Sequence, residues 1–262
     1  MKILKPGTDL DLFCRQLKTS PNKLLILDYD GTLAPFQIDP GKARPYPGVI
    51  EKLNEIMEHP NTNLVIVSGR WTRDLLPLLR LNRMPELWGS HGLERLKKDG
   101  NYEVFNMDEK GLDGLVLADE SVEQMGLSGR FEKKPGCLAV HWRGVNQRKA
   151  GEMKALIMKK WALIAMSYGL LLKEFDGGME LRVPGRNKGD AVKILLSESP
   201  RHTVAAYLGD DLTDEDAFNA IDDKGISVLV REKLRKTRAD IWIKPPEELL
   251  DFLSLWISGK NW

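Results

Sequence analysis

The sequence has little cysteine, no long apolar run and no surplus of charge of one sign. Its 262 residues include only Cys14 and Cys137, which form no CxxC pair. A disulfide framework and a cysteine-ligated zinc site are therefore disfavoured, and a reducing compartment is favoured. No window approaches the roughly 18 apolar residues of a membrane span. We therefore expect a cytoplasmic protein that makes no contact with a membrane.

The charges balance almost completely. Lys and Arg number 39 and Asp and Glu 38, so no overall field attracts nucleic acid or an anionic membrane. The basic stretch REKLRKTR, residues 231–238, has no interleaved aromatic side chains, and we interpret it as a solvated face. A hydrophobic content of 42% suffices for one or two cores. These features indicate a soluble globular protein, in which any bound anion must be met by local positive charges.

The stretch LLILDYDGTL, residues 24–33, combines a strand with two carboxylates. Its four leading apolar residues predict a strand buried on both faces of a parallel sheet. Asp28 and Asp30 project to one side of the strand's carboxyl end, Tyr29 projects to the other, and Gly31 lets the backbone turn. Ligands of open parallel sheets bind at this edge. An Asx-type turn would explain one Asp, but not the whole string.

Two further segments place polar groups where a phosphate could bind. The predicted strand NLVIV, residues 63–67, ends in Ser68 and Gly69. A hydroxyl beside the free amides of a helix start can bind phosphate oxygens, although a plain helix cap is the commoner role of such a serine. Lys188 stands in the first turn of a predicted helix, where a cation is unfavourable. It is explained if it faces an anion, either Asp28 or a bound phosphate.

The segment GDDLTDEDAF, residues 209–218, concentrates acids after another predicted strand. Negative charge is favourable at a helix N-terminus, which accounts for Glu215 and Asp216. It does not account for Asp210 and Asp211, which precede the helix. Hard carboxylate oxygens at the end of a strand suit Mg²⁺, which keeps several waters and shares a substrate phosphate.

Between residues 110 and 182 the pattern changes to a helix, two strands, a long helix and two strands. This order predicts a small α+β unit inserted into a larger α/β body. We expect core residues 1–109 and 183–262 with a cap at 110–182. The polar residues of the predicted cap sheet could face solvent or a substrate, and both readings stay open; they are Glu132, Lys134, His141, Arg143, Glu180 and Arg182.

Several strings resemble one family in their order and approximate spacing. DYDGTLAP, SGR, GSHGLE, the cap strings ExK and HWR, MELRVPGRNKGDA and GDDLTDEDAF are similar to motifs of trehalose-6-phosphate phosphatases, in the haloacid-dehalogenase (HAD) superfamily. The resemblance covers nearly the whole chain and implies a Rossmann-like core, a parallel sheet flanked by helices, with an inserted α+β cap. The family more often has HYR where this chain has HWR, and the loop at Gly177 and Gly178 is unlike the usual strings. Both departures weaken the cap contacts, not the chemistry.

The resemblance also implies residue roles. Asp28 attacks phosphorus to form an aspartyl-phosphate, Asp30 acts as acid and base, and Lys188 assists. Ser68, Gly69 and Lys188 bind the phosphate. The implied ligands of a Mg²⁺ cofactor are Asp28, Asp30, Asp210, Asp211 and Asp214. The residues implied to contact sugar hydroxyls are His91, Glu94, Lys134 and Glu180.

Electrostatics makes the cation obligatory in this interpretation, because two like charges about 4 Å apart repel by ~4 kcal/mol at an effective dielectric of about 20. The expected reaction is hydrolysis of trehalose 6-phosphate to trehalose and phosphate, in association with a trehalose-6-phosphate synthase. Alternatives are a phosphatase of sucrose 6-phosphate or mannosyl-3-phosphoglycerate type, a phosphomannomutase-like transfer, and a non-catalytic sugar-phosphate-binding partner of a synthase.

Overall fold

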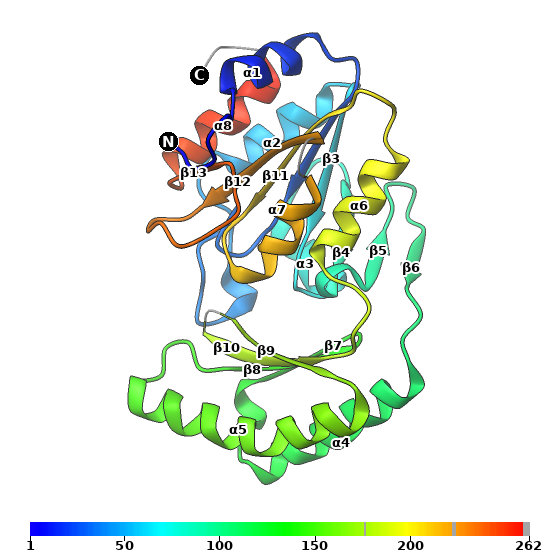
Figure 1. Cartoon of the computed structure of the whole chain (residues 1–262), viewed down its shortest axis with the longest axis vertical. Coiled ribbons are helices and arrows are strands. Elements are labelled where there is room, and N and C mark those ends of the chain that lie inside the picture. The colour runs from blue at the N-terminus through cyan, green and yellow to red at the C-terminus, as the bar shows by residue number, and fades with distance from the viewer. Residues whose placement is uncertain (176, 222–223, 259–262) are drawn as a thin grey trace. The chain divides into compact units, whose positions relative to one another are not determined.

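The computed structural model describes residues 1–175, 177–221 and 224–258. The chain forms two compact units, one of Met1–Glu103 with Arg186–Trp262 and one of Val104–Gly185 (Figure 1). The division of the function between a core and a cap stays a prediction.

The first unit is built on a nine-stranded sheet in the order β1-β13-β12-β11-β2-β3-β4-β5-β6. The neighbours from β13 through β4 are parallel, whereas β1 and β5 join antiparallel to β13 and β4. The strands are β1 (Lys2–Ile3), β2 (Lys23–Leu27), β3 (Thr62–Val67), β4 (Glu86–Gly89), β5 (Glu94–Leu96), β6 (Tyr102–Val104), β11 (Val204–Gly209), β12 (Gly225–Val230) and β13 (Ile241–Ile243).

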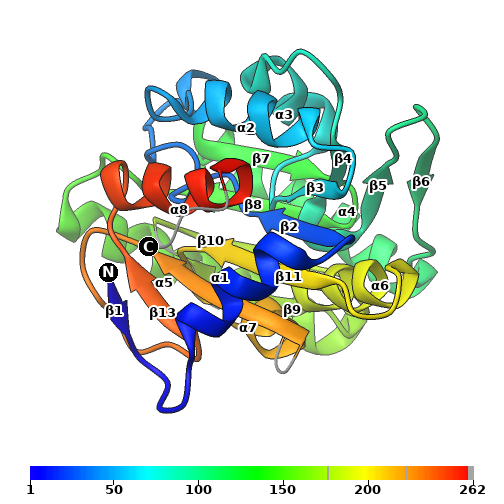
Figure 2. The same cartoon turned by 90° about the horizontal axis from the view of Figure 1, so that it is seen from above.

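Helices cover both faces of this sheet, as Figure 2 shows, which confirms the expected α/β class. Buried residues of α1 (Leu10–Thr19), α2 (Val49–Glu58), α3 (Thr72–Leu79) and α8 (Glu247–Ser258) share one core cluster on one face of the sheet. On the other face lie α6 (Lys188–Glu198) and α7 (Glu215–Ile221). Alternation along β2 sends Leu25 and Leu27 into the core beneath the first group. Leu24 and Ile26 point to the opposite face and are equally buried. A strand covered on both sides needs this continuous apolar run.

One expectation about this sheet is wrong. From the sequence alone, GISVLV (residues 225–230) and ADIWI (residues 239–243) predict short edge strands. In the structure β12 lies between β11 and β13, and β13 lies between β12 and β1. The physical reason is visible in β12, where Ile226, Val228, Leu229 and Val230 are all buried. Such burial on both faces belongs to an interior strand.

The inserted unit has a four-stranded antiparallel sheet in the order β7-β8-β10-β9. The two helices α4 and α5 lie along one face of it in Figure 1, and Trp161 of α5, fully buried, donates from Nε1 to Ser121 Oγ of α4 at 3.2 Å. Its elements are α4 (Glu109–Gln124), β7 (Phe131–Lys134), β8 (Cys137–His141), α5 (Gln147–Tyr168), β9 (Leu171–Phe175) and β10 (Gly178–Arg182). The expected small α+β unit is confirmed.

Short 3₁₀ turns complete the described chain: η1 (Pro40–Lys42), η2 (Ser90–Gly92), η3 (Ser128–Arg130) and η4 (Leu212–Asp214). Among the helices of the described ranges, none combines the length and the apolar character that crossing a membrane requires.

Candidate active site

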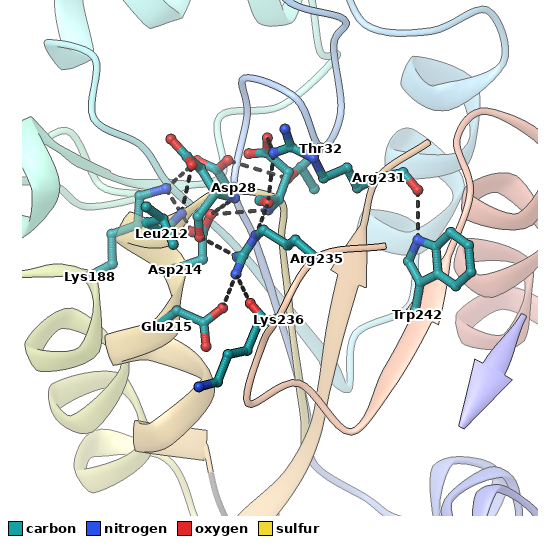
Figure 3. Close-up of polar contacts among 12 residues, drawn as sticks. Asp28, Thr32, Lys188, Leu212, Asp214, Glu215, Arg231, Arg235, Lys236 and Trp242 are labelled. Atoms are coloured by element: carbon teal, nitrogen blue, oxygen red, sulfur yellow. Dashed lines mark hydrogen bonds and ion pairs between the residues drawn. The ribbon is translucent and has the colours of Figure 1, made fainter. Parts of the chain in front are cut away.

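Acidic side chains from distant parts of the sequence meet at the carboxyl ends of the adjacent parallel strands β2 and β11. One carboxylate oxygen from each of Asp28, Asp210 and Asp214 lies within 4.8 Å of the others, and all three residues are buried. Asp28 and Asp214 point toward the ammonium group of Lys188 in Figure 3. The strand pairing explains the meeting, because Leu208 of β11 is the register partner of Leu27.

Asp28 is held from two sides. Its Oδ1 accepts a hydrogen bond from Lys188 Nζ at 2.7 Å, and its Oδ2 accepts one from Thr32 Oγ1 at 3.3 Å. Burial raises the pKa of Asp28 to about 7, an effect that Lys188 opposes and the charge of Asp214 reinforces. Additional positive charge at this site would therefore keep the carboxylate ionised, as its predicted role as a nucleophile requires.

Lys188 reaches the acids because it is the first residue of α6. Asn187 caps that helix by accepting from the amide of Asp190 at 3.0 Å. The Lys188 ammonium then donates to Asp214 Oδ1 at 2.7 Å as well as to Asp28. Burial lowers the pKa of Lys188, but the two carboxylates outweigh it and leave that pKa above its ordinary value. The lysine is thus a fixed positive charge within the acidic cluster.

Asp214 orders the loop after β11. Its Oδ1 accepts from Lys188 and, at 2.6 Å, from the hydroxyl of Tyr207. Its Oδ2 accepts from the amides of Asp210 at 3.0 Å and Asp211 at 2.9 Å. Although burial opposes ionisation, Lys188 and these hydrogen bonds keep the pKa of Asp214 below its ordinary value. An ionised Asp214 therefore holds the loop, and its part as a metal ligand stays a prediction.

Asp210 is buried beside two other acids, and Arg231 Nη1 lies 3.8 Å from its Oδ2. Burial, followed by the charges of Asp28 and Asp214, raises its pKa well above the usual value. Its carboxylate lies against Gly31, where an added Cβ would stand 2.2 Å from Asp210 Oδ2 and the backbone φ is +83°. Hard oxygen donors that are costly to ionise without a partner fit a divalent cation such as Mg²⁺.

Asp211 has a different environment. Its Oδ1 accepts from the amide of Leu212 at 2.7 Å and caps η4. This bond gives the side chain a structural role, and a direct or water-mediated contact with a metal stays a prediction.

Asp30 is engaged by an arginine. Nε and Nη2 of Arg70 donate to its two carboxylate oxygens at 2.6 and 2.7 Å, and Nη1 donates to the carbonyl of Pro40 at 2.9 Å. This fork orients the proposed acid/base and ties the ends of β2 and β3 together. Metal ligation by Asp30 stays a prediction.

The predicted phosphate-binding residues that follow β3 lie beside His91, a predicted sugar contact in η2 after β4. Ser68 Oγ accepts from the amide of Arg70 at 3.1 Å. The His91 amide donates to the Ser68 carbonyl at 3.0 Å, and its ring lies so near Gly69 that a Cβ there would be 2.5 Å from His91 Cε1. The structure thus brings Ser68, Gly69 and His91 into one cluster.

Glu94 is fully buried and has a structural role in this fold. Its Oε1 accepts from the Thr72 amide at 3.0 Å and Ser90 Oγ at 2.9 Å. Its Oε2 accepts from Thr72 Oγ1 and Tyr102 OH, both at 2.8 Å. These bonds anchor the start of α3 to β5 and β6, and contact of Glu94 with a sugar stays a prediction.

The two predicted substrate residues of the inserted unit lie in its sheet. Lys134 Nζ is 3.6 Å from Glu132 Oε2, and the lysine side chain is 7% exposed. Glu180 Oε1 is 3.4 Å from Arg182 Nη1, with both side chains buried. For Lys134, Glu180 and Arg182, exposure to solvent and contact with a substrate both stay predictions.

Sequence reasoning missed four residues of the core site. Thr32 and Arg70 stand inside quoted motifs, so their positions were visible although their partners were not. Tyr207 and Arg235 carry no local signal. Arg235 donates from Nε to the Asp210 carbonyl at 3.0 Å, and its side chain is only 16% exposed. The interpretation of the 231–238 stretch as a solvated face is therefore wrong at this residue.

Known proteins resemble this chain in sequence and in fold. A trehalose-phosphate phosphatase of Mycobacterium marinum is 27% identical over 252 residues, which cover 89% of this chain and 61% of that protein. The probable trehalose-phosphate phosphatase J of Arabidopsis thaliana is 27% identical over 277 residues, covering 96% and 72%. The C-terminal domain of the Candida albicans trehalose-6-phosphate phosphatase superposes with a TM-score of 0.78 at 25% identity, covering 98% and 99%.

The two curated relatives are named as trehalose-phosphate phosphatases, and such phosphatases are phosphoric monoester hydrolases, which agrees with the expected enzyme class. The family model described as trehalose-phosphatase matches residues 26–241. That range includes every predicted site residue, from Asp28 to Asp214. The chain belongs to the trehalose-phosphatase family.

Proposed function

We propose that the chain is a Mg²⁺-dependent phosphatase that hydrolyses trehalose 6-phosphate to trehalose and phosphate through an aspartyl-phosphate. The observation that supports it most is the buried cluster of Asp28, Asp210 and Asp214, in which Asp28 and Asp214 both accept hydrogen bonds from the ammonium of Lys188. Burying three carboxylates around one lysine is costly for stability. Such a cluster is better explained by chemistry on an anion than by the needs of the fold.

In the proposed reaction the carboxylate of Asp28 attacks phosphorus, and the bond to the sugar oxygen breaks as Asp30 gives that oxygen a proton. Water then attacks the acyl phosphate while Asp30 takes a proton back, which releases phosphate and restores Asp28. Lys188 neutralises charge on the transferring group. When bound, Mg²⁺ would supply Lewis-acid neutralisation of the phosphoryl oxygens, held by Asp28, Asp210 and the Asp30 carbonyl.

The phosphate-binding residues are proposed from their place beside this cluster's sheet edge. Ser68 and Gly69 follow β3, the strand parallel to β2, and Lys188 belongs to the cluster itself. The proposed sugar contacts are His91 and Glu94 in the core and Lys134 and Glu180 in the inserted unit. Cytoplasmic location and association with a trehalose-6-phosphate synthase are parts of the same proposal.

The decisive variant is Asp28→Asn, which preserves volume but removes the nucleophile. We expect Mg²⁺-dependent phosphate release from trehalose 6-phosphate to fall by at least about 10³-fold, as when a catalytic nucleophile is lost. Circular dichroism should show an unchanged fold. Phosphate release at the wild-type rate would refute the covalent step, and no release by the wild-type protein would favour a non-catalytic binding role.

The substrate is tested separately. Phosphate release from trehalose 6-phosphate should exceed release from sucrose 6-phosphate, mannosyl-3-phosphoglycerate and glucose 6-phosphate, compared as kcat/KM at equal Mg²⁺. A higher value for any other member of this panel would transfer the assignment to that sugar phosphate and leave the Asp28 chemistry in place.

A further inference from the structure

The basic stretch after β12 holds the backbone of the loop that carries Asp210. The guanidinium of Arg235 donates from Nε to the carbonyl of Asp210 at 3.0 Å and from Nη2 to the carbonyl of Asp211 at 2.7 Å. Its Nη1 donates to the carbonyl of Lys236 at 2.8 Å and pairs with the carboxylate of Glu215 (Figure 3). One arginine side chain thus joins three peptide carbonyls, two of them in the 210–211 loop, to one acid.

Glu215 braces this arginine from the start of α7. Its Oε1 also accepts from Thr237 Oγ1 at 2.8 Å, and its Oε2 accepts from the amide of Arg238 at 2.8 Å. Side-chain exposure is 16% for Arg235 and 21% for Glu215. Partial burial with several directional bonds distinguishes this pair from a solvated surface ion pair.

The loop is consequently held from two directions. The amides of Asp210 and Asp211 donate to Asp214, and their carbonyls accept from Arg235. Both hydrogen-bonding groups of each residue are therefore engaged. Fixing these peptide planes limits where the Asp210 carboxylate can lie relative to Asp28. Mg²⁺ requires ligands close to ideal octahedral positions, so its affinity depends on such fixing.

We propose that Arg235, braced by Glu215, is a positioning residue that holds the 210–211 backbone in the geometry needed to bind a divalent cation. The inference rests on the proposed function, because it needs a cation at Asp28 and Asp210. It assigns to the basic stretch a role that neither the motif strings nor the acids themselves indicate.

Whether Mg²⁺ affinity rises or falls on replacing Arg235 distinguishes a positioning role of this residue from a purely electrostatic one. Arg235 is a cation near a cation site, so removing its charge alone would strengthen metal binding by relieving repulsion. Removing its hydrogen bonds would weaken metal binding by releasing the loop. A loss of affinity on neutralising Arg235 therefore indicates positioning.

The experiment is calorimetric titration of Mg²⁺ into the substrate-free protein, with Arg235→Met, Arg235→Lys and Arg238→Met beside the wild type. We expect Mg²⁺ affinity to fall by about 10-fold or more in Arg235→Met, the scale for groups that support metal ligands. Arg235→Lys keeps the charge but not the fork, and should lose part of that affinity.

Arg238→Met is the matched control. Arg238 is an exposed arginine of the same stretch, and its Nη1 donates to Asn219 Oδ1 at 2.8 Å. Its substitution by Met removes the same charge and leaves the hydrogen bonds to the 210–211 carbonyls in place. Its Mg²⁺ affinity should stay within about two-fold of the wild type. Ca²⁺ accepts flexible coordination and should lose less affinity than Mg²⁺ in Arg235→Met.

The possible results divide cleanly. Equal or tighter Mg²⁺ binding by Arg235→Met than by the wild type would overturn the positioning role while leaving the phosphatase proposal intact. Absence of Mg²⁺ binding to the wild type would overturn both. Should Arg235→Met lose its folded circular dichroism spectrum, the comparison of Arg235→Lys with the wild type decides in its place.

Discussion

At the scale of single residues, the site concentrates charge that the fold would not otherwise tolerate. Asp28 and Asp210 are 3% and 2% exposed, and burial raises the pKa of both. Lys188 compensates part of that cost, and Asp214 is ionised because its own bonds favour the charged form. Asp214 thus orders the loop, whereas Asp28 and Asp210 would be more fully ionised with additional positive charge nearby.

Gly31 allows Asp210 to take its place, which makes Gly31→Ala a test at this scale. The new Cβ would lie 2.2 Å from Asp210 Oδ2, so the carboxylate must move. We expect loss of most phosphate release, measured at saturating Mg²⁺, and a lower free energy of unfolding in urea. Backbone strain alone costs ~1–2 kcal/mol for a left-handed non-glycine residue.

Gly7→Ala supplies the control for that strain. Gly7 has a φ of +90°, and an added Cβ would meet nothing within 4 Å. It should therefore lose comparable stability and keep its phosphate release. Equal activities of the two alanine variants would mean that the contact of Gly31 with Asp210 is irrelevant to turnover.

At the scale of elements, the first turn of α6 delivers a cation to the acids of two strand ends. A lysine at a helix N-terminus opposes the helix dipole, and its placement is explained by the two carboxylates that receive its ammonium. The cap formed by Asn187 and Asp190 fixes the start of the helix. Helix start and lysine position are therefore coupled.

Asn187→Ala tests this coupling. Loss of the bond to the Asp190 amide should lower the free energy of unfolding by ~1 kcal/mol. It should also reduce kcat for phosphate release, because the Lys188 ammonium is no longer held at 2.7 Å from Asp28.

Asn146→Ala removes the equivalent cap from α5, where Asn146 accepts from the Lys149 amide at 2.9 Å. Since α5 carries no proposed catalytic residue, this control should lose stability alone. A similar fall of kcat in both variants would assign the effect to stability rather than to Lys188.

At the scale of the whole molecule, local patterns predicted the elements and strand neighbours predicted part of the site. The apolar run before Asp28 and the similar run before Asp210 both indicated parallel strands, so their acids were expected at one edge. The contacts of Arg235 and Tyr207 were not predictable, because they depend on which loop crosses which strand end. The order β11-β12-β13 likewise depends on long-range strand pairing, which the side-chain periods of about 2.0 residues in strands and about 3.6 residues in helices do not report.

The proposed need for a cation has a consequence for the stability of the entire chain. The pKa of Asp28 is raised from 3.8 to about 7 in the folded protein, and that of Asp210 is also raised. A carboxyl with a raised folded pKa supports folding fully below its unfolded pKa, and this support is lost as pH rises through the folded pKa. Lys188 stays charged over this range, since its pKa is raised above an already basic value.

Without divalent cations, the melting temperature of the wild type should therefore fall, relative to Asp28→Asn, as pH rises from about 4 to about 7. Binding of Mg²⁺ offsets the repulsion among ionised acids, so a fixed Mg²⁺ concentration should raise the free energy of unfolding more at pH 8 than at pH 5. A free Mg²⁺ concentration of 100 times the dissociation constant should raise it by about 2.7 kcal/mol. Scanning calorimetry with and without chelator measures both effects. Parallel pH profiles of the two proteins, or equal Mg²⁺ stabilisation at both pH values, would mean that Asp28 does not carry the charge burden inferred from its burial.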